Sequence, residues 1–372
     1  MHVGLNKIQR AGTNARTSYP IRVHYTVCFN MAPIAHLVCI VIMGSLFSAF
    51  SFHAMAADTL RAMSDMPGVS YRASLPAPTA DENDLAQRLK RHVVAIASHE
   101  HNVAHYNRLE QAAQYLEKAL GDYGYQVRQQ EFMAAGRKVR NLEVSLKPEK
   151  SGGVRPELVV IGAHYDSAID APGANDNGSG TAAVVELAGL LKDIPLPDSR
   201  EIRLVLYVNE EMPYFGTSAM GSMVHARDLH ARGEDVAAML SLETIGYYSD
   251  EKGSQKYPLM LASAYPDKGN FIGFVSDPGA IALLHQAVAS FRRHAAFPSE
   301  GLAAPADTPG VEWSDHWSYR QFGYPAIMVT DTALYRYPYY HTAQDTPDKI
   351  DFVRLARVVK GLEQVIGDLV NP

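Results

Sequence analysis

Three groups of potential metal ligands directly follow apolar runs that are typical of buried strands. In chain order, these are His164 and Asp166 after the run 158–161, Glu210 and Glu211 after 202–208, and Glu243 after 237–242. Ligands of an open α/β sheet bind beyond the carboxyl ends of its strands, so we expect these side chains to meet at one edge. Imidazole and carboxylate groups together are typical of a site for a divalent metal such as zinc.

The spacing of His164 and Asp166 suits a histidine that binds a metal. On an extended backbone, residues two apart point to the same face, so the Asp166 carboxylate could accept the second imidazole N–H. Such a contact fixes the tautomer and raises the basicity of the ligand. By itself the pair is a weak motif, because an ordinary loop histidine has the same pattern.

The loop 172–180 is rich in turn-forming residues and leads into a predicted helix at Thr181. It is either a flexible surface loop or a tight turn that directs Asp176 at the metal bound by His164. A serine nucleophile is not supported, because the G-x-S-x-G pattern around Ser179 would need glycine where Asn177 and Thr181 stand.

Adjacent carboxylates at Glu210 and Glu211 allow a division of labour. Successive residues at a strand end point in different directions, so one carboxylate could bind a cation while the other takes a proton from water. His341, in the segment 340–346, is a further candidate ligand. The segment 313–316 is interpreted as structural or as support for the ligands.

Apolar periodicity predicts an α/β fold. Leu85, Leu89 and Val93 recur at helical spacing, and Asn107 with Glu110 predicts a capping box for a second helix. Short apolar runs, the last at 326–329, then alternate with helical segments at 181–191, 280–293 and 352–369. This alternation predicts a three-layer α/β sandwich with a mixed, mostly parallel sheet and helices on both faces.

Charge and cysteine content exclude several classes of site. From Asp58 onward the chain has 30 basic and 40 acidic residues, which removes the electrostatic case for nucleic acid as a partner. Both cysteines, Cys28 and Cys39, lie in the first 57 residues. Any metal bound by the rest of the chain must therefore use histidines and carboxylates.

The first 56 residues predict an export signal. An apolar run at 37–50, followed by Ala54-Met55-Ala56, predicts a signal peptide cleaved after Ala56, and the alternative is an uncleaved membrane anchor. Residues 57–80 are expected to form a linker, and 81–372 a single domain. We expect an exported protein, periplasmic or secreted, that touches a membrane only if the leader is an uncleaved anchor.

In combination, five motifs resemble the co-catalytic di-zinc aminopeptidase family, whose relatives include bacterial leucyl aminopeptidase, aminopeptidase Y, glutamate carboxypeptidase II and glutaminyl cyclases. The resemblance runs from about Asp84 to Leu369. The motifs are GAHYDS at 162–167, PGANDNGSG at 172–180, NEE at 209–211, SDH at 314–316 and YHTAQDTPDKID at 340–351.

The resemblance implies a role for each matched residue. His164 and Glu243 would hold one Zn2+, Glu211 and His341 a second, and Asp176 would bridge both. Glu210 would be the general base that activates a metal-bridging hydroxide, with Asp166 supporting His164 and Tyr340 stabilising the oxyanion. The implied activity is a zinc-dependent exopeptidase, most simply an aminopeptidase acting on peptide substrates.

One departure and several rival functions accompany the resemblance. Many members of the family have aspartate where this chain has Glu243, which affects the geometry of one metal. A glutaminyl cyclase or a carboxypeptidase of the same fold are the enzymatic alternatives, and a binding homologue without catalysis is the third. The intact ligand set argues against the cyclase and the binding homologue, while carboxypeptidase action stays open as an alternative.

Overall fold

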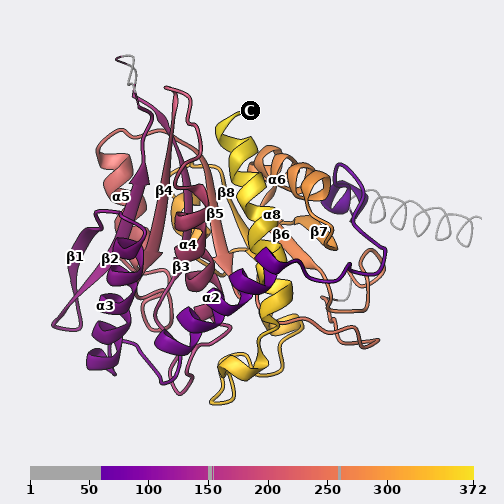
Figure 1. Ribbon diagram of the computed structural model, residues 1–372, viewed down its shortest axis with the longest axis horizontal. Helices are drawn as coiled ribbons and strands as arrows, with labels where there is room; N and C mark the ends of the chain where they lie inside the picture. The colour runs from indigo at the N-terminus through magenta and orange to yellow at the C-terminus, as the bar shows by residue number, and fades with distance from the viewer. Residues whose placement is uncertain (1–59, 150–152, 154, 259–260) are drawn as a thin grey trace, which may run out of the picture. The chain divides into compact units, whose positions relative to one another are not determined.

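A mixed sheet of eight strands forms the centre of the protein (Figure 1). The computed structural model describes residues 60–149, 153, 155–258 and 261–372. The strand order is β1-β2-β4-β3-β5-β8-β6-β7. The strands are β1 (Arg128–Ala134), β2 (Arg137–Leu146), β3 (Glu157–His164), β4 (Arg200–Tyr207), β5 (Val236–Glu243), β6 (Ile272–Ser276), β7 (Ser299–Ala303) and β8 (Ala326–Thr330).

Parallel strands occupy the middle of the sheet. β3 runs parallel to both β4 and β5, and β5 runs parallel to β8. β1 and β2 form an antiparallel hairpin at one edge, and β6 and β7 form a parallel pair that meets β8 in antiparallel orientation. The predicted mixed, mostly parallel sheet is confirmed, although the sequence did not predict β1, β2, β6 or β7.

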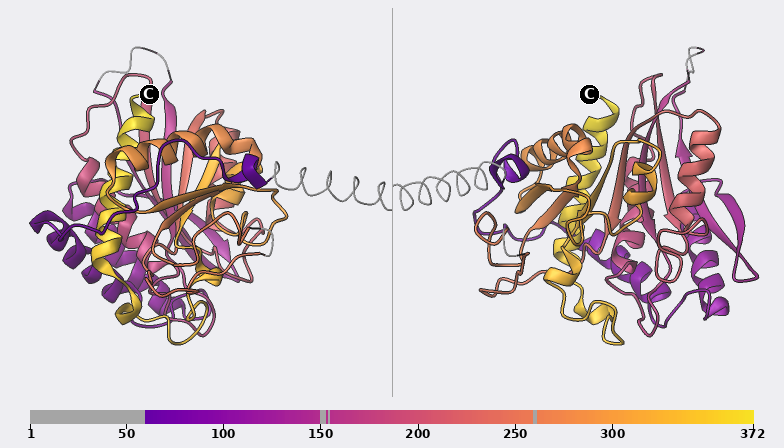
Figure 2. Two further views of the ribbon diagram at one scale, coloured as in Figure 1. Left: turned by 90° about the vertical axis from the view of Figure 1, so that its right-hand side faces the viewer. Right: turned by 180° about the vertical axis from the view of Figure 1, so that it is seen from behind.

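Helices cover both faces of the sheet, which confirms the three-layer sandwich (Figures 1 and 2). One face carries α2 (Ala80–Ile96), α3 (Tyr106–Asp122), α4 (Gly178–Leu191), α6 (Ile281–His294) and α8 (Phe352–Val370). The other face carries α5 (Gly221–Ala231) and the short α7 (His316–Arg320). No helix within the described residues is long and apolar enough to cross a bilayer. The predicted leader, 37–50, lies outside these residues.

The starts of α2 and α3 differ in whether a capping box is present. Thr79 caps α2 in a reciprocal capping box with Glu82, since each side chain accepts the other residue's backbone N–H. The box predicted at Asn107 and Glu110 is wrong. α3 begins at Tyr106, and both oxygens of Glu110 instead accept hydrogen bonds from Arg140 on β2.

The described part of the predicted linker, residues 60–79, packs on the sheet edge. Met66 is buried in the main core, and the Arg292 guanidinium on α6 donates to the carbonyls of Met66, Pro67 and Gly68. At the edge strand β7, Ser299 donates its backbone N–H to Ser70 Oγ at 3.0 Å and accepts from Arg292 at 3.0 Å. This segment therefore covers the outer edge of β7.

A buried polar network joins the sheet to α5 and α7. His225 on α5 contacts Glu143 of β2 through Nε2 at 2.9 Å and the Tyr319 hydroxyl through Nδ1 at 2.6 Å. Tyr319 contacts the Tyr207 hydroxyl at 2.7 Å. Burial opposes the charge of Glu143, but His225 and nearby Arg203 outweigh burial and lower the pKa of Glu143 to about 2.

We predict that Glu143→Gln destabilises the fold in a pH-dependent way. The pKa of Glu143 is depressed from 4.5 to about 2, so its contribution is present above pH 4.5 and is lost as pH falls towards 2. The substitution should lower the free energy of unfolding by about 3 kcal/mol at pH 7 and by less than half of that at pH 3. Urea unfolding at both pH values measures this. Glu131→Gln, which removes an exposed ion pair with Lys138, is the control. An equal loss at both pH values would contradict the prediction.

Candidate active site

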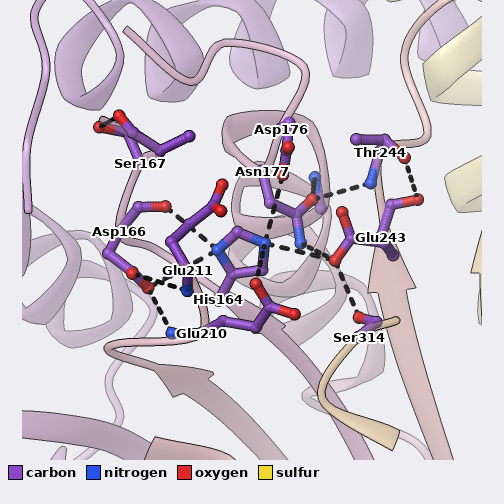
Figure 3. A network of polar contacts seen from close by, with 12 residues as sticks. His164, Asp166, Ser167, Asp176, Asn177, Glu210, Glu211, Glu243, Thr244 and Ser314 are labelled. Atoms are coloured by element: carbon purple, nitrogen blue, oxygen red, sulfur yellow. Dashed lines mark hydrogen bonds and ion pairs between the residues drawn. The ribbon is translucent and has the colours of Figure 1, made fainter. Parts of the chain in front are cut away.

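The carboxyl ends of β3, β4 and β5 place their polar residues side by side at one edge of the sheet. β3 ends at His164, β5 ends at Glu243, and Glu210 and Glu211 follow β4 after a turn at Asn209. All four residues are buried, with relative exposures of 1% to 8%. Figure 3 shows their side chains converging.

Asp176 lies between the two histidines. Its Oδ1 is 3.3 Å from His164 Nε2, and its Oδ2 is 2.9 Å from His341 Nε2. Glu243 Oε2 is also 3.3 Å from His164 Nε2, whereas Glu211 Oε1 is 3.3 Å from His341 Nε2. Each oxygen of Asp176 thus faces a different histidine and a different second carboxylate.

Among the described residues, three groups of ligands could hold a metal ion, and two of these groups share Asp176. The first is His164, Asp176 and Glu243, and the second is Asp176, Glu211 and His341. Within each group the ligand atoms lie within 4.8 Å of one another. The third group combines His164 with Glu210 and Glu211. The structure therefore brings together all five residues that the sequence proposed as ligands.

Negative charge is in excess at this cluster. Burial and the charge of Asp176 raise the pKa of Glu211 to about 7. Burial likewise raises the pKa of Glu243 to about 7, and burial with its acidic neighbours raises the pKa of Glu210 well above its usual range. Burial opposes the charge of His341, but its contacts with Asp176 and Glu211 raise its pKa to about 11. Such a cluster is stabilised by cations.

The residues present fit bound metal ions. His164 Nε2, Asp176 Oδ2 and Glu211 Oε1 are buried, and their contacts of 2.9 to 3.3 Å within the ligand groups do not have the geometry of a hydrogen bond, so they have no hydrogen-bond partner among the described residues. Buried polar atoms without partners are costly, and these three belong to the ligand groups. The donor set of imidazole nitrogens and carboxylate oxygens, without thiolates, is one that zinc accepts.

Asp166 supports the site differently from the sequence expectation. The second ring nitrogen of His164, Nδ1, is 3.1 Å from the backbone carbonyl oxygen of Asp166 and 3.6 Å from its carboxylate. The two carboxylate oxygens instead accept the backbone N–H groups of Glu210, at 3.1 Å, and Glu211, at 3.2 Å. Asp166 thus orients the histidine through its backbone and the Glu210-Glu211 turn through its side chain.

A serine from the segment 313–316 holds Glu243. Ser314 Oγ donates to Glu243 Oε2 at 2.8 Å and contacts Ser241 Oγ at 2.8 Å (Figure 3). His316 in the same segment contacts the Val311 carbonyl through Nε2 at 2.8 Å and does not reach the ligand groups.

The loop that carries Asp176 is held by acidic residues that the sequence analysis did not assign. Asp345 accepts the backbone N–H groups of Asn175, at 2.8 Å, and Asp176, at 3.2 Å. Asp331 accepts the Asn175 side-chain amide at 2.9 Å. Asp345 lies in the YHTAQDTPDKID motif, and this motif is the only feature of the sequence that indicates a role for Asp345 in the site. Ser179, in the same loop, uses its hydroxyl in hydrogen bonds with the backbone of Asn175 and Ile245.

Asn177 and Gly180 fix the start of α4 beside Glu243. Asn177 Nδ2 donates to the Leu242 carbonyl at 2.7 Å, and its Oδ1 accepts from Gly180 N and Thr244 N, both at 3.1 Å. A Cβ at Gly180 would collide with the Leu242 carbonyl and the Asn177 side chain. Glycine here allows helix and strand backbones to approach closely.

Positive φ angles occur at or beside three residues of the site. Asn209, just before Glu210, has a φ of 63°, and Thr244, just after Glu243, has a φ of 43°. His341 itself has a φ of 55°. Such conformations are costly for residues with a Cβ and persist where the surrounding structure imposes them. The backbone is therefore shaped to aim these side chains.

Tyr340 lies at the border of the ligand cluster. Its ring stacks on the His341 ring with centroids 3.9 Å apart and an interplanar angle of 19°. It also lines, together with Glu243, a largely apolar pocket beside the site.

This arrangement defines the class of the protein. An α/β sandwich with a histidine and carboxylate cluster at the carboxyl ends of its strands, and an adjoining pocket, is built as a metal-dependent hydrolase.

Comparison with known proteins gives the family. The model of peptidase family M28 matches residues 141–366, a range that contains every ligand candidate. The chain belongs to peptidase family M28.

Curated relatives include proteins named as aminopeptidases. The chain is 36% identical over 274 residues to the uncharacterized protein YfbL of Escherichia coli, covering 71% of this chain and 81% of that protein. It is 29% identical over 220 residues to aminopeptidase YwaD of Bacillus subtilis, covering 58% and 40% of the two chains. Leucine aminopeptidase 1 of Emericella nidulans is 27% identical over 227 residues, covering 58% and 52%. The match thus spans about half the length of these two aminopeptidases.

Solved structures share the fold. The aminopeptidase from Aneurinibacillus sp. strain AM-1 superposes with a TM-score of 0.58 at 16% identity, covering 77% of this chain and 95% of that chain. The glutaminyl cyclase of Fimbriiglobus ruber superposes with a TM-score of 0.56 at 20% identity, covering 79% and 99%. The predicted family and fold class are confirmed, and the family is one of peptidases, which confirms the predicted class of enzyme as a peptidase. The roles of individual residues stay predictions.

We predict that Ser314→Ala lowers the zinc affinity of the site about tenfold. Without the Ser314 hydrogen bond, Glu243 loses the group that orients its carboxylate, and such supporting contacts are worth roughly 10- to 100-fold in affinity. Competition with a chelator of known affinity measures the change. Ser290→Ala is the matched control, because Ser290 donates to Asp368 at 2.6 Å between α6 and α8. Equal affinities for wild type and Ser314→Ala would contradict the prediction.

Proposed function

We propose that the protein is a two-zinc aminopeptidase that removes N-terminal residues from peptides, with Glu210 as general base. The observation that carries the proposal is the position of Asp176, whose two oxygens face two separate groups of ligands. Two metals close together commonly require a bridging carboxylate.

Residues of five chain segments would hold the two ions. His164, Glu243 and one oxygen of Asp176 suit the first, and Glu211, His341 and the other oxygen of Asp176 suit the second. Zinc bound there would lower the pKa of water towards neutrality and polarise the scissile carbonyl.

Glu210 is the carboxylate of the cluster that remains available for proton transfer. Its side chain makes no hydrogen bond within the described residues, and its nearest basic atom, His164 Nε2, is 3.8 Å from Oε2. Its backbone is fixed by Asp166. A raised pKa suits a group that takes a proton from the attacking water and passes it to the leaving amine.

Tyr340 is the candidate for stabilising the oxyanion. Its ring is held against His341 and it borders the pocket that adjoins Glu243. A phenol hydroxyl there could donate to the oxygen on which negative charge develops. This role depends on the substrate lying between the ligand cluster and the pocket.

Aminopeptidase action is favoured over the other activities of the fold by the ligand set. A free substrate amine needs acidic groups or a second metal at the end of the site, and this chain brings Asp176, Glu211 and Glu243 together there. The names of the curated relatives support the same activity. The solved structures with the same fold include a glutaminyl cyclase, so the fold alone does not distinguish aminopeptidase activity from glutaminyl cyclase activity.

The cellular location follows from the predicted leader. We propose that the protein is exported to the periplasm or secreted, or remains anchored if the leader is not cleaved. A protease-protection assay on intact cells and spheroplasts separates these locations.

The activity is tested with a panel of model substrates. The purified protein with zinc should hydrolyse aminoacyl 4-nitroanilides, and it should hydrolyse neither the N-acetylated forms nor peptides blocked at the N-terminus. Cyclisation of N-terminal glutamine or release of C-terminal residues, without release of nitroaniline, would overturn the aminopeptidase proposal.

We predict that Glu210→Gln keeps its zinc and loses turnover. An amide cannot take the proton, so kcat should fall by about 100- to 10,000-fold while the metal content stays equal to wild type. Nitroaniline release and metal analysis measure the two quantities. Glu251→Gln, at an exposed position, is the control. A near-normal rate would show that Glu210 is not the general base.

We predict that His341→Ala loses one of two zinc ions per chain. The substitution removes one ligand from the group of Asp176, Glu211 and His341 and leaves the other group complete. Metal analysis after dialysis should fall from about two ions to about one. His294→Ala is the matched control, since His294 is partly exposed and pairs with Asp368 far from this group. One zinc ion in both wild type and variant would contradict a two-metal site.

A further inference from the structure

A largely apolar pocket opens directly beside the metal ligands. Glu243 and Tyr340 form one end of it, and the sheet strands β8, β6 and β7 contribute its floor. Aromatic and aliphatic side chains from loops complete its walls, among them Tyr257, Leu261, Phe271 and Val311. Away from Glu243, the residue Glu300 adds a carboxylate to this largely apolar surface.

Strand register places Glu300 in line with the metal ligand Glu243. Glu243 on β5 pairs with Thr330 on β8, Thr330 pairs with Gly273 on β6, and Gly273 pairs with Glu300 on β7. Residues paired in register point to the same face of a sheet. Glu243 and Glu300 therefore stand at opposite ends of one row, three strand spacings or about 14 Å apart between Cα atoms.

The position between Thr330 and Glu300 in this row is a glycine, so no side chain fills the space there. Gly273 has no side chain, so a trough lies between Thr330 and Glu300. On the same face, the next row contains Met328, Val275 and Leu302, and these side chains form an apolar cluster with Val311. The trough thus has apolar sides, the metal ligands at one end and a carboxylate at the other.

The carboxylate of Glu300 is only loosely paired. Its side chain is 20% exposed, and its Oε2 is 3.8 Å from Arg292 Nη2, beyond hydrogen-bond distance. Arg292 directs its donors to backbone carbonyls of 66–68 and of Ser299 instead. Burial raises the pKa of Glu300, although Arg292, Arg72 and a hydrogen bond with Ser70 act in the opposite direction.

We propose that Glu300 is a specificity-determining residue, which selects substrates whose N-terminal residue is lysine or arginine. This inference rests on the proposed aminopeptidase function. The straight aliphatic stem of such a side chain packs along the apolar trough, and its charged end reaches the Glu300 carboxylate. A pocket without Glu300 would select leucine or methionine by apolar contact alone.

The first test uses wild-type protein and two substrates that differ in one charged group. Lysyl 4-nitroanilide and norleucyl 4-nitroanilide share the same four-carbon stem, and only lysine carries the ammonium group. We expect kcat/KM for the lysyl substrate to exceed that for the norleucyl substrate by at least about tenfold. An equal or higher kcat/KM for norleucine would overturn the proposal, without the need for any variant.

The second test uses Glu300→Gln, which keeps the shape and removes the charge. The ratio of lysyl to norleucyl kcat/KM should fall about 10- to 100-fold, while the norleucyl value stays within about threefold of wild type. Asp307→Asn is the control, because Asp307 is an exposed carboxylate on the loop that borders the pocket. Its ratio should equal that of wild type. An unchanged ratio in Glu300→Gln would overturn the role of Glu300.

The outcomes separate this inference from the proposed function. If no anilide is hydrolysed in the presence of zinc, the aminopeptidase proposal fails and the inference fails with it. If norleucyl and leucyl anilides are hydrolysed as well as the lysyl substrate, the aminopeptidase stands and the selectivity assigned to Glu300 is wrong.

Discussion

The site is organised around the crowding of like charge at the carboxyl ends of parallel strands. Asp176, Glu210, Glu211 and Glu243 are all buried at one edge of the sheet, with two histidines between them. Carboxylates in this density repel one another unless cations balance them. Ligand binding and the stability of this edge are therefore linked, because any ion that the four groups hold also removes their mutual repulsion.

Many of the hydrogen bonds around the site fix the backbone of the segments that carry the site residues, rather than the side chains of those residues. Asp166 receives the two N–H groups of the Glu210-Glu211 turn, and Asp345 receives those of Asn175 and Asp176. Positive φ angles at Asn209 and Thr244 are maintained in the same region. Ligand direction is thus set largely by the path of the chain, and Ser314 is a side chain that in addition holds the carboxylate of Glu243.

The sequence predicted the elements whose pattern is local. β3, β4, β5 and β8 are buried on both faces and appear as apolar runs, and the ligand candidates follow three of these runs. β1 was missed because its residues are mostly polar, and β6 and β7 because each is short and has a glycine that interrupts its apolar residues. Asp345 supports a loop far away in the chain, and Glu300 gains its position from the register of four strands. Neither relation is visible from spacing.

The outer edge of β7 has a consequence for solubility. An exposed edge strand offers unpaired N–H and C=O groups to other chains, a common route to aggregation. Here Ser70 and Arg292 occupy both backbone groups of Ser299, and the Tyr265 hydroxyl donates to the Gly301 carbonyl at 2.7 Å. Ser70, Arg292 and Tyr265 together therefore occupy backbone groups along this edge, which hinders the addition of a further strand to the sheet.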